Sequence, residues 1–233
     1  YTDESTRWQQ NTLAADPATG LPVGALLLNR FSTSYEERAL FTNVTIGFTD
    51  TFDVQFGARS IDNEQSYSAD TSGPLPAGGR AITPELTTDE TAFTYLVTPR
   101  WRVSPDLMIY ARLASGYRPG GVNPGAETFG LQRSFAKDET DNYELGVKAA
   151  LLDRMLSVEA SVYYIDWKDI QLSVLDPVSR LSYSTNASRA ESRGVELSAD
   201  ARPLDGLRIA AWVAWNDAQL TEAFPPTSLS FGR

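Results

Sequence analysis

Alternating apolar and polar residues recur in eight stretches of this chain, and this pattern limits the folds that the chain can adopt. Successive side chains of a β-strand point to opposite faces, so each stretch predicts a strand with one apolar and one polar face. Residues 143–152 show the pattern most clearly. The apolar face there carries Tyr143, Leu145, Val147, Ala149 and Leu151, and the polar face carries Asn142, Glu144, Gly146 and Lys148.

The expected strands come in four pairs, with short turns inside each pair and long polar segments between pairs. Barrels of the outer membrane have the same asymmetry, with short periplasmic turns and long outer loops. The pairs are 37–49 with 52–66, 92–103 with 107–117, 138–152 with 155–172, and 183–202 with 207–220.

Strand length and the positions of aromatic residues favour a membrane barrel over a soluble β-sandwich. Strands in soluble sheets typically have about 5 to 6 residues, and all eight of the expected strands are longer. We therefore predict an all-β fold: a segment of an antiparallel up-and-down transmembrane β-barrel with about eight strands in four hairpins. A sandwich whose core is packed by the aromatic rings is the alternative. Rings near strand ends, as in an interfacial girdle, are Phe52, Trp101, Tyr117, Tyr143, Tyr164, Trp167 and Trp215.

Two local features of the strands can be predicted. Pro99 lies inside an expected strand but cannot donate to the sheet ladder, so we expect an irregularity there. A two-residue turn at 153–154 would satisfy both faces of one hairpin. It would place Lys148 opposite Glu159, Leu145 opposite Val162 and Tyr143 opposite Tyr164.

The composition removes several classes of function. The chain has no cysteine and no histidine, so thiol nucleophiles, imidazole bases and the usual zinc ligands are missing. Its net charge of −10 does not suit binding to nucleic-acid phosphates. No stretch reaches the roughly 18 apolar residues that a membrane-spanning helix needs. We expect no enzyme activity, no catalytic residues, no cofactor and no nucleic-acid partner.

We expect a single partial barrel domain over residues 1–233. Residues 1–36 are mostly polar and contain several turn-forming residues, so they are interpreted as the end of a strand followed by a long outer loop. Residues 37–222 are assigned to barrel strands and 223–233 to a final loop. No basic start followed by an apolar run is present, so no signal peptide is expected.

Three segments resemble the C-terminal barrel domain of TonB-dependent outer-membrane receptors, especially the iron-complex receptors of Gram-negative bacteria. The segments are LMIYARLASGYRPGG at 107–121, DNYELGVK at 141–148 and SRGVEL at 192–197. They occur in this order, with short turns between hairpin partners. The strands from residue 37 onward fit the same layout.

The resemblance implies a location, a mechanism and partners. It implies a barrel of 22 strands in the outer membrane, of which this chain would be an internal piece of about a third. The function implied is energy-coupled uptake of a scarce ligand, foremost a ferric siderophore; vitamins, saccharides and other metal complexes are competing ligands. Outer-membrane lipid and lipopolysaccharide would surround the wall. The TonB complex would act through an N-terminal plug region, and nothing in this chain resembles that plug.

Two other readings of the pattern remain open. Eight strands can close around their own side chains, so the chain could form a complete small barrel with a structural or adhesion role. A soluble β-protein that binds a partner is the third reading.

Candidate ligand-binding residues lie in or beside the Gly/Pro-rich segment at 118–137. Arg118, Asn123 and Arg133 could hold an anionic metal chelate by charge-assisted hydrogen bonds. Contact with lipopolysaccharide phosphates, or solvation of a loop, would also explain them. Asn186 begins an N-x-S sequon, which often occurs by chance, and it is given no role.

Acidic clusters also occur, and carboxylates grouped in an outer loop could bind calcium or a cationic ligand. Solvated loop mouths are the simpler interpretation, so no metal site is assigned. The clusters are Asp3-Glu4, Asp62 with Glu64, Asp89-Glu90, and Asp138-Glu139 with Asp141.

Overall fold

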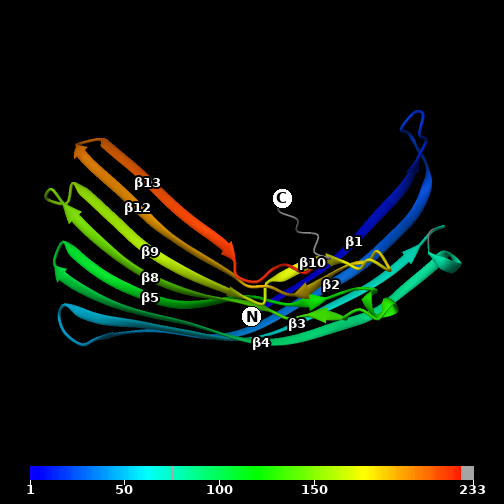
Figure 1. Cartoon of the computed structure of the whole chain (residues 1–233), viewed down its shortest axis with the longest axis horizontal. Coiled ribbons are helices and arrows are strands. Elements are labelled where there is room, and N and C mark those ends of the chain that lie inside the picture. The colour runs from blue at the N-terminus through cyan, green and yellow to red at the C-terminus, as the bar shows by residue number, and fades with distance from the viewer. Residues whose placement is uncertain (75, 227–233) are drawn as a thin grey trace.

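The computed structural model describes residues 1–74 and 76–226, which build one nine-stranded antiparallel sheet and two small hairpins. Each strand of the large sheet lies beside its neighbour in the chain, apart from the two hairpins inserted in connections. Figure 1 shows this sheet as an open, curved trough with β1 and β13 at its edges. Its strands are β1 (Thr2–Ala15), β2 (Pro22–Gly47), β3 (Phe52–Ser72), β4 (Arg80–Ser104), β5 (Leu107–Arg118), β8 (Asp138–Leu151), β9 (Leu156–Lys168), β12 (Ala190–Leu204) and β13 (Leu207–Leu220).

The two ends of the sheet differ, as predicted. The turns within the four expected hairpins lie at one end, and the longer connections lie at the other end (Figure 1). Two of these connections carry the small hairpins. The small elements are β6 (Gly121–Val122), β7 (Ser134–Phe135), β10 (Gln171–Leu175), β11 (Ser182–Asn186) and the 3₁₀ turns η1 (Ala77–Gly79) and η2 (Ala126–Phe129).

All four predicted hairpins are present, but the structure differs from the expectation for residues 1–36. That region forms β1 and the first half of β2 in place of a long loop. Asp16, Pro17 and Gly20 lie in a tight turn, in which Asp16 O accepts a hydrogen bond of 2.8 Å from Gly20 N, whereas Pro22 and Gly24 lie at the start of β2. Both faces of these strand segments carry polar residues, so no apolar alternation marked them as strands. Residues 223–226 contain no strand, and 227–233 lie outside the described residues.

Two expected strands extended too far into a connection. The stretch 155–172 divides into β9 and the start of β10, and 183–202 divides into β11 and β12. The chain changes direction at Asp169 and Ser188, which have φ angles of 53° and 84°. Residues other than glycine seldom adopt such φ angles. The residue types at Asp169 and Ser188 therefore did not predict the two breaks.

The predicted register of the β8–β9 hairpin is confirmed in all three pairs. Lys148 lies opposite Glu159, and the pairs Leu145 with Val162 and Tyr143 with Tyr164 follow in the same ladder. Both central turn residues have positive φ, 55° at residue 153 and 66° at residue 154. Leu152 before them also has positive φ, 53°, so the connection contains three consecutive left-handed residues, one more than the two of a type I′ turn.

The irregularity expected at Pro99 is confirmed. The β4–β5 ladder pairs Val97 with Leu113 and resumes only at Arg100 with Tyr110. On its other side, Pro99 pairs with Val54 without a shift in register. The ladder is thus interrupted only on the β5 side.

The convex face of the trough is apolar across many strands. One row of directly opposed residues joins Leu145, Val162, Val195 and Trp215 from four neighbouring strands. Leu145 is 55% exposed and Trp215 is 60% exposed. An apolar surface this extensive indicates contact with another apolar phase. Trp167 is an exception to the expected aromatic girdle, because it packs against Ile170 and its neighbours beneath the β10–β11 hairpin.

The concave face is polar and packs large rings over glycines. Tyr110 lies directly opposite Gly146, and a Cβ on that glycine would lie 2.4 Å from the Tyr110 ring. Gly194 is covered in the same way by Tyr163, its direct neighbour on β9. The missing side chains therefore make room for two tyrosines that fill the concave surface.

We expect Gly146→Ala to destabilise the wall by about 1–3 kcal/mol, because its methyl group must displace the buried Tyr110 ring. The measurement is the free energy of unfolding in urea. Gly47→Ala is the matched control, since no atom lies within 4 Å of a Cβ built there. Equal losses for the two variants would contradict the proposed packing.

Candidate functional site

The two longest connections meet over the concave face and are joined by side-chain amides. Asn123, in the segment 119–137, donates from Nδ2 to Ser184 O at 2.7 Å and to Gln132 O at 3.2 Å. Its Oδ1 accepts from Ser184 N at 2.8 Å. The amide thus pairs with the backbone of β11, in the segment 169–189, much as a strand residue would. We call these two segments the joined loops.

Asn186 and Gln171, both in the segment 169–189, add further hydrogen bonds to the segment 119–137. Asn186 Nδ2 donates to Ala136 O at 2.8 Å, and its Oδ1 accepts from Ala136 N at 2.7 Å. Gln171 Nε2 donates to Pro119 O at 2.9 Å. Buried backbone groups need such partners because unpaired ones cost free energy. The two loops therefore form one body.

Glu90 of β4 fastens the joined loops to the wall. Its two carboxylate oxygens accept from Lys137 N at 2.7 Å and from Gly120 N at 3.0 Å, which are the two ends of the first loop. Gln65 of β3 adds a bond of 2.8 Å to Gly120 O. Because hydrogen bonds to an ionised carboxylate are stronger than neutral ones, Glu90 is the main anchor.

Ion pairs surround the base of the joined loops. Arg118 pairs with the buried Asp138, and its guanidinium lies 5.9 Å from the centre of the Trp167 ring. Asp166 accepts two hydrogen bonds from Arg189, the first at 2.7 Å. These pairs neutralise most of the local charge and hold the ends of three strands together.

The tip of the β10–β11 hairpin is closed by one carboxylate. Asp176 Oδ2 accepts from Ser179 N at 2.6 Å and from Ser179 Oγ at 2.7 Å. These hydrogen bonds hold the pKa of Asp176 below its ordinary value. These hydrogen bonds close the turn between β10 and β11.

The structure gives the three predicted ligand-binding residues different surroundings. Asn123 is 5% exposed and fully engaged in the joint between the loops. Arg118 is engaged with Asp138, although half of its side chain is exposed. Arg133 is largely exposed and pairs with the equally exposed Glu127 at 3.2 Å. Its backbone carbonyl accepts from Asn123 N at 2.7 Å, so these two lie together.

The acidic clusters lie mainly in strands. Asp62, Glu64 and Asp89 are inside β3 and β4, and Asp138 is held by Arg118. Within residues 1–74 and 76–226 there is no group of three or more acidic side chains that could hold a metal ion.

Sequence reasoning missed the residues that build the joint. Asn186 was noticed only as part of a sequon, and Glu90 only as part of an acidic pair. Gln171 carried no signal at all. Their roles depend on carbonyl and amide groups far away in the chain, which no local pattern reveals.

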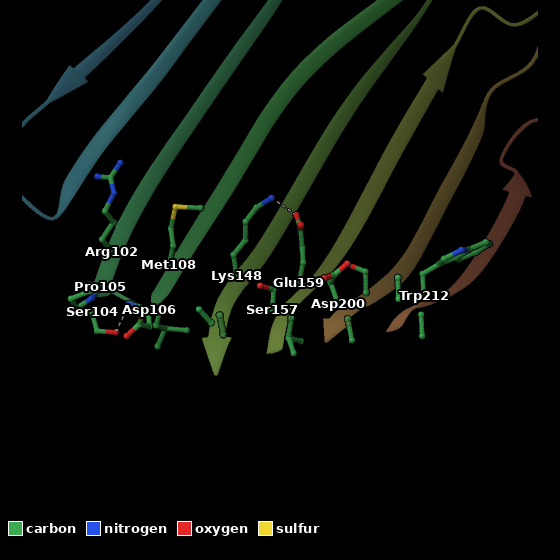
Figure 2. Close-up of a pocket in the computed structure, with 18 residues that line it drawn as sticks. Arg102, Ser104, Pro105, Asp106, Met108, Lys148, Ser157, Glu159, Asp200 and Trp212 are labelled. Atoms are coloured by element: carbon green, nitrogen blue, oxygen red, sulfur yellow. Dashed lines mark hydrogen bonds and ion pairs between the residues drawn. The ribbon is translucent and has the colours of Figure 1, made fainter. Parts of the chain in front are cut away.

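The concave face also holds an open pocket near the short-turn end (Figure 2). Its charged residues come from neighbouring strands and are largely paired, as Lys148 is with Glu159. Arg102 pairs with Asp53 at 2.6 Å. Trp212 is 82% exposed on this surface. The arrangement provides a polar wall whose charges are largely paired.

Comparison with known families identifies the architecture. A family model described as the β-barrel of TonB-dependent receptor-like proteins matches residues 1–232. The chain belongs to this family. Its members are transport receptors, and those of Gram-negative bacteria are outer-membrane proteins. Among the described residues, no helix has both the length and the apolar character needed to cross a membrane.

Curated relatives include receptors for different ligands. The pesticin receptor of Yersinia pestis is 30% identical over 197 residues, which is 82% of this chain and 28% of that receptor. The metal-pseudopaline receptor CntO of Pseudomonas aeruginosa is 28% identical over 129 residues, covering 54% of this chain and 17% of that receptor. The chain thus spans less than a third of these relatives.

Solved structures share the fold. The ferric yersiniabactin uptake receptor FyuA from Yersinia pestis superposes with a TM-score of 0.73 and 23% identity, over 94% of this chain and 32% of that one. The ferric-catecholate import receptor Fiu from E. coli K12, in its closed form, gives 0.67 and 17%, over 97% and 36%. At this identity the likeness supports the fold alone.

We expect Asn123→Ala to loosen the joint between the loops. Ser184 N would lose its acceptor, at a cost of about 1–3 kcal/mol, while Ser184 O would keep its hydrogen bond from Gln132 Nε2. Hydrogen exchange at the Ser184 amide should therefore become about tenfold faster or more. Asn11→Ala, at an exposed position in β1, is the control, and unchanged exchange in Asn123→Ala would show that the loops are held together by other contacts.

Proposed function

We propose that the receptor containing this chain takes up a scarce ligand across the outer membrane, and that this ligand is a ferric siderophore. The observation that carries the proposal is the family match over almost the whole chain, combined with loops fastened over a polar concave wall. In this arrangement the chain supplies part of the barrel wall and of the outer loops.

The relatives support the class of ligand. The names of two solved structures refer to ferric yersiniabactin and to ferric catecholates, and one curated relative is a metal-pseudopaline receptor. These names share a metal ion bound to a small organic chelator. Since the chain covers only part of each relative, the activity of the complete protein is our proposal.

The orientation follows from the two ends of the sheet. Long loops of such barrels face outward and short turns face the periplasm, so the joined loops would meet the ligand first. The convex apolar rows would face lipid, with lipopolysaccharide around the loop end. The TonB complex would act through an N-terminal plug region of the complete receptor.

Arg133 and Arg118 could contribute to capture of an anionic chelate. Both guanidinium groups are partly exposed, and each is balanced by one carboxylate. A ligand carboxylate or phenolate could compete for these cations. Asn123 would support them indirectly by fixing the loop.

Uptake of iron tests the proposed function. A strain that carries the complete receptor as its only siderophore receptor should accumulate ⁵⁵Fe from at least one ferric siderophore, and dissipating the proton gradient should abolish accumulation. Receptor-free cells are the control. Uptake that equals this control for phenolate, catecholate and hydroxamate siderophores would contradict the proposal.

The assignment of the two faces gives a second prediction. In the complete receptor, Leu145→Arg should cost about 2–4 kcal/mol near the bilayer midplane, because an arginine would replace a lipid-facing side chain. Lys148→Gln, on the concave face of the same strand, should cost much less. The measurement is the free energy of unfolding after refolding into lipid vesicles. Similar losses from both changes would contradict the assignment.

The other readings of the sequence are not favoured. The sheet has nine strands with two open edges among the described residues, and its family forms larger barrels. A soluble sandwich would also require a second sheet to cover the apolar rows.

A further inference from the structure

The loop-side half of β4 is paired on one side only. Its ladder with β3 begins at Arg80, whereas its ladder with β5 begins only at Leu96. Figure 1 shows β4 running past the loop end of β5. In the described part of the chain, no other backbone–backbone hydrogen bond reaches residues 86–94. These residues therefore leave an open sheet edge inside the wall, which we call the β4 edge.

Two side-chain contacts show which backbone groups face the open side. Tyr95 N donates to Ser115 Oγ of β5 at 2.9 Å, and Thr91 O accepts from Lys137 Nζ at 3.1 Å. In an antiparallel strand the backbone groups of alternate residues point to the same side. An extended peptide could thus pair with the β4 edge as a further strand. The residues of this edge whose backbone groups have no partner on the open side are Thr87, Asp89 and Phe93.

The β4 edge lies beyond the apolar band. Phe93 belongs to the same row of opposed residues as Leu40, the last apolar convex residue of β2 toward the loop end. At about 3.3 Å per residue, Asp89 lies about 13 Å further along the strand. Since β4 and β5 are neighbours in the sheet, further barrel strands would join at β1 or β13 and not here. In the proposed orientation the β4 edge would be open to the cell exterior.

A groove of about 340 Å³ follows this edge. Thr87 and Asp89 line one side, and Gly120 and Ala136 at the base of the joined loops line the other. Asn63 of β3 also lines the groove and is 4% exposed, and among the described residues neither Nδ2 nor Oδ1 of its side chain has a hydrogen-bond partner. Buried polar groups without partners cost free energy, so a bound chain that supplied them would be stabilised.

The charge beside the β4 edge is negative. Asp3, Glu36, Glu64 and Asp89 form one row of directly opposed residues on the convex face of β1 to β4. Like charges in opposed positions destabilise a sheet. In the described ranges, Glu36 alone of the four pairs with a cation, Arg38, at 2.6 Å. The row ends at the open edge, so a basic residue on an added strand would continue it with the opposite charge.

We propose that the β4 edge binds an extended basic segment of a partner protein as an added β-strand. The backbone of β4 would supply affinity, and a lysine or arginine opposite Asp89 would supply specificity. Lys137 already places an ammonium group on this edge, at Thr91 O. The inference goes beyond ligand uptake and uses only the proposed orientation of the sheet.

Binding of synthetic peptides to the complete receptor in detergent tests this inference. The probe is a short fluorescein-labelled peptide of alternating threonine and lysine, measured by fluorescence anisotropy, and it should bind saturably. The same peptide with glutamate in place of lysine should not bind. N-methylation of the lysines keeps their charge but removes the backbone donors that would pair with Asp89 O and its neighbours, so it should weaken binding about tenfold or more.

Two receptor variants locate the site. Thr87→Pro removes a backbone donor on the open side only, and it should weaken binding of the lysine peptide about 3- to 10-fold. Pro99 shows that β4 accepts proline at such a position without a shift against β3. Asp89→Lys replaces attraction with repulsion and should weaken binding by a similar factor. Asp50→Lys makes the same change of charge at a short turn and should bind the peptide as the unaltered receptor does.

Accumulation of ⁵⁵Fe by each variant reports folding. Thr87→Pro and Asp89→Lys alter different groups, so if one variant fails to accumulate iron, the other decides. Equal binding of the lysine peptide and its N-methylated form would show attraction by charge alone and would overturn the proposal.

Three other results would also overturn it: no saturable binding of the lysine peptide, unchanged binding in both variants, or a receptor dimer that the peptide disrupts. With normal iron accumulation, each of these results leaves the proposed transport function standing. Peptide binding without iron accumulation would contradict the transport function alone.

Discussion

The alternation of side chains along each strand is the constraint on which the rest of this structure depends. A slip of one residue would exchange the two faces of a strand, so apolar rows and polar rows must be in register together. The β8–β9 hairpin shows this clearly, because Leu145 with Val162 and Lys148 with Glu159 belong to one ladder. The same register places Tyr110 over Gly146, where only a residue without a side chain fits.

The loop end depends on a different interaction, the pairing of side chains with distant backbone groups. The Glu90 carboxylate accepts hydrogen bonds from both ends of one loop, and the Asn123 amide binds that loop to the next one. Together these contacts fix the loops without a hydrophobic core of ordinary size. The two loops thus form one continuous surface over the concave face.

The sequence allowed the wall to be predicted far better than the site. Period-two alternation identified the four hairpins and the β8–β9 register, and the missing backbone donor of proline identified the irregularity at Pro99, because each depends on neighbouring residues. It failed for β1 and the start of β2, where both faces are polar, and at Asp169, where a positive φ has no local signal. Asn123 was noticed as a polar loop residue, but its buried position depends on a backbone group 61 residues away. The ligand-binding role of Arg118 and Arg133 stays a prediction.

The order of the strands has a consequence for how such a wall assembles. Each strand of the large sheet pairs with the previous large strand in the chain, so most contacts can form soon after a hairpin turn does. The hydrogen-bonding groups along the free sides of β1 and β13 have no partner in the described residues, so each of these edges can pair with a further strand. An unpaired edge also accepts a wrong strand, so this sheet is exposed to association with other chains along β1 and β13 and protected from it wherever a strand is paired on both sides.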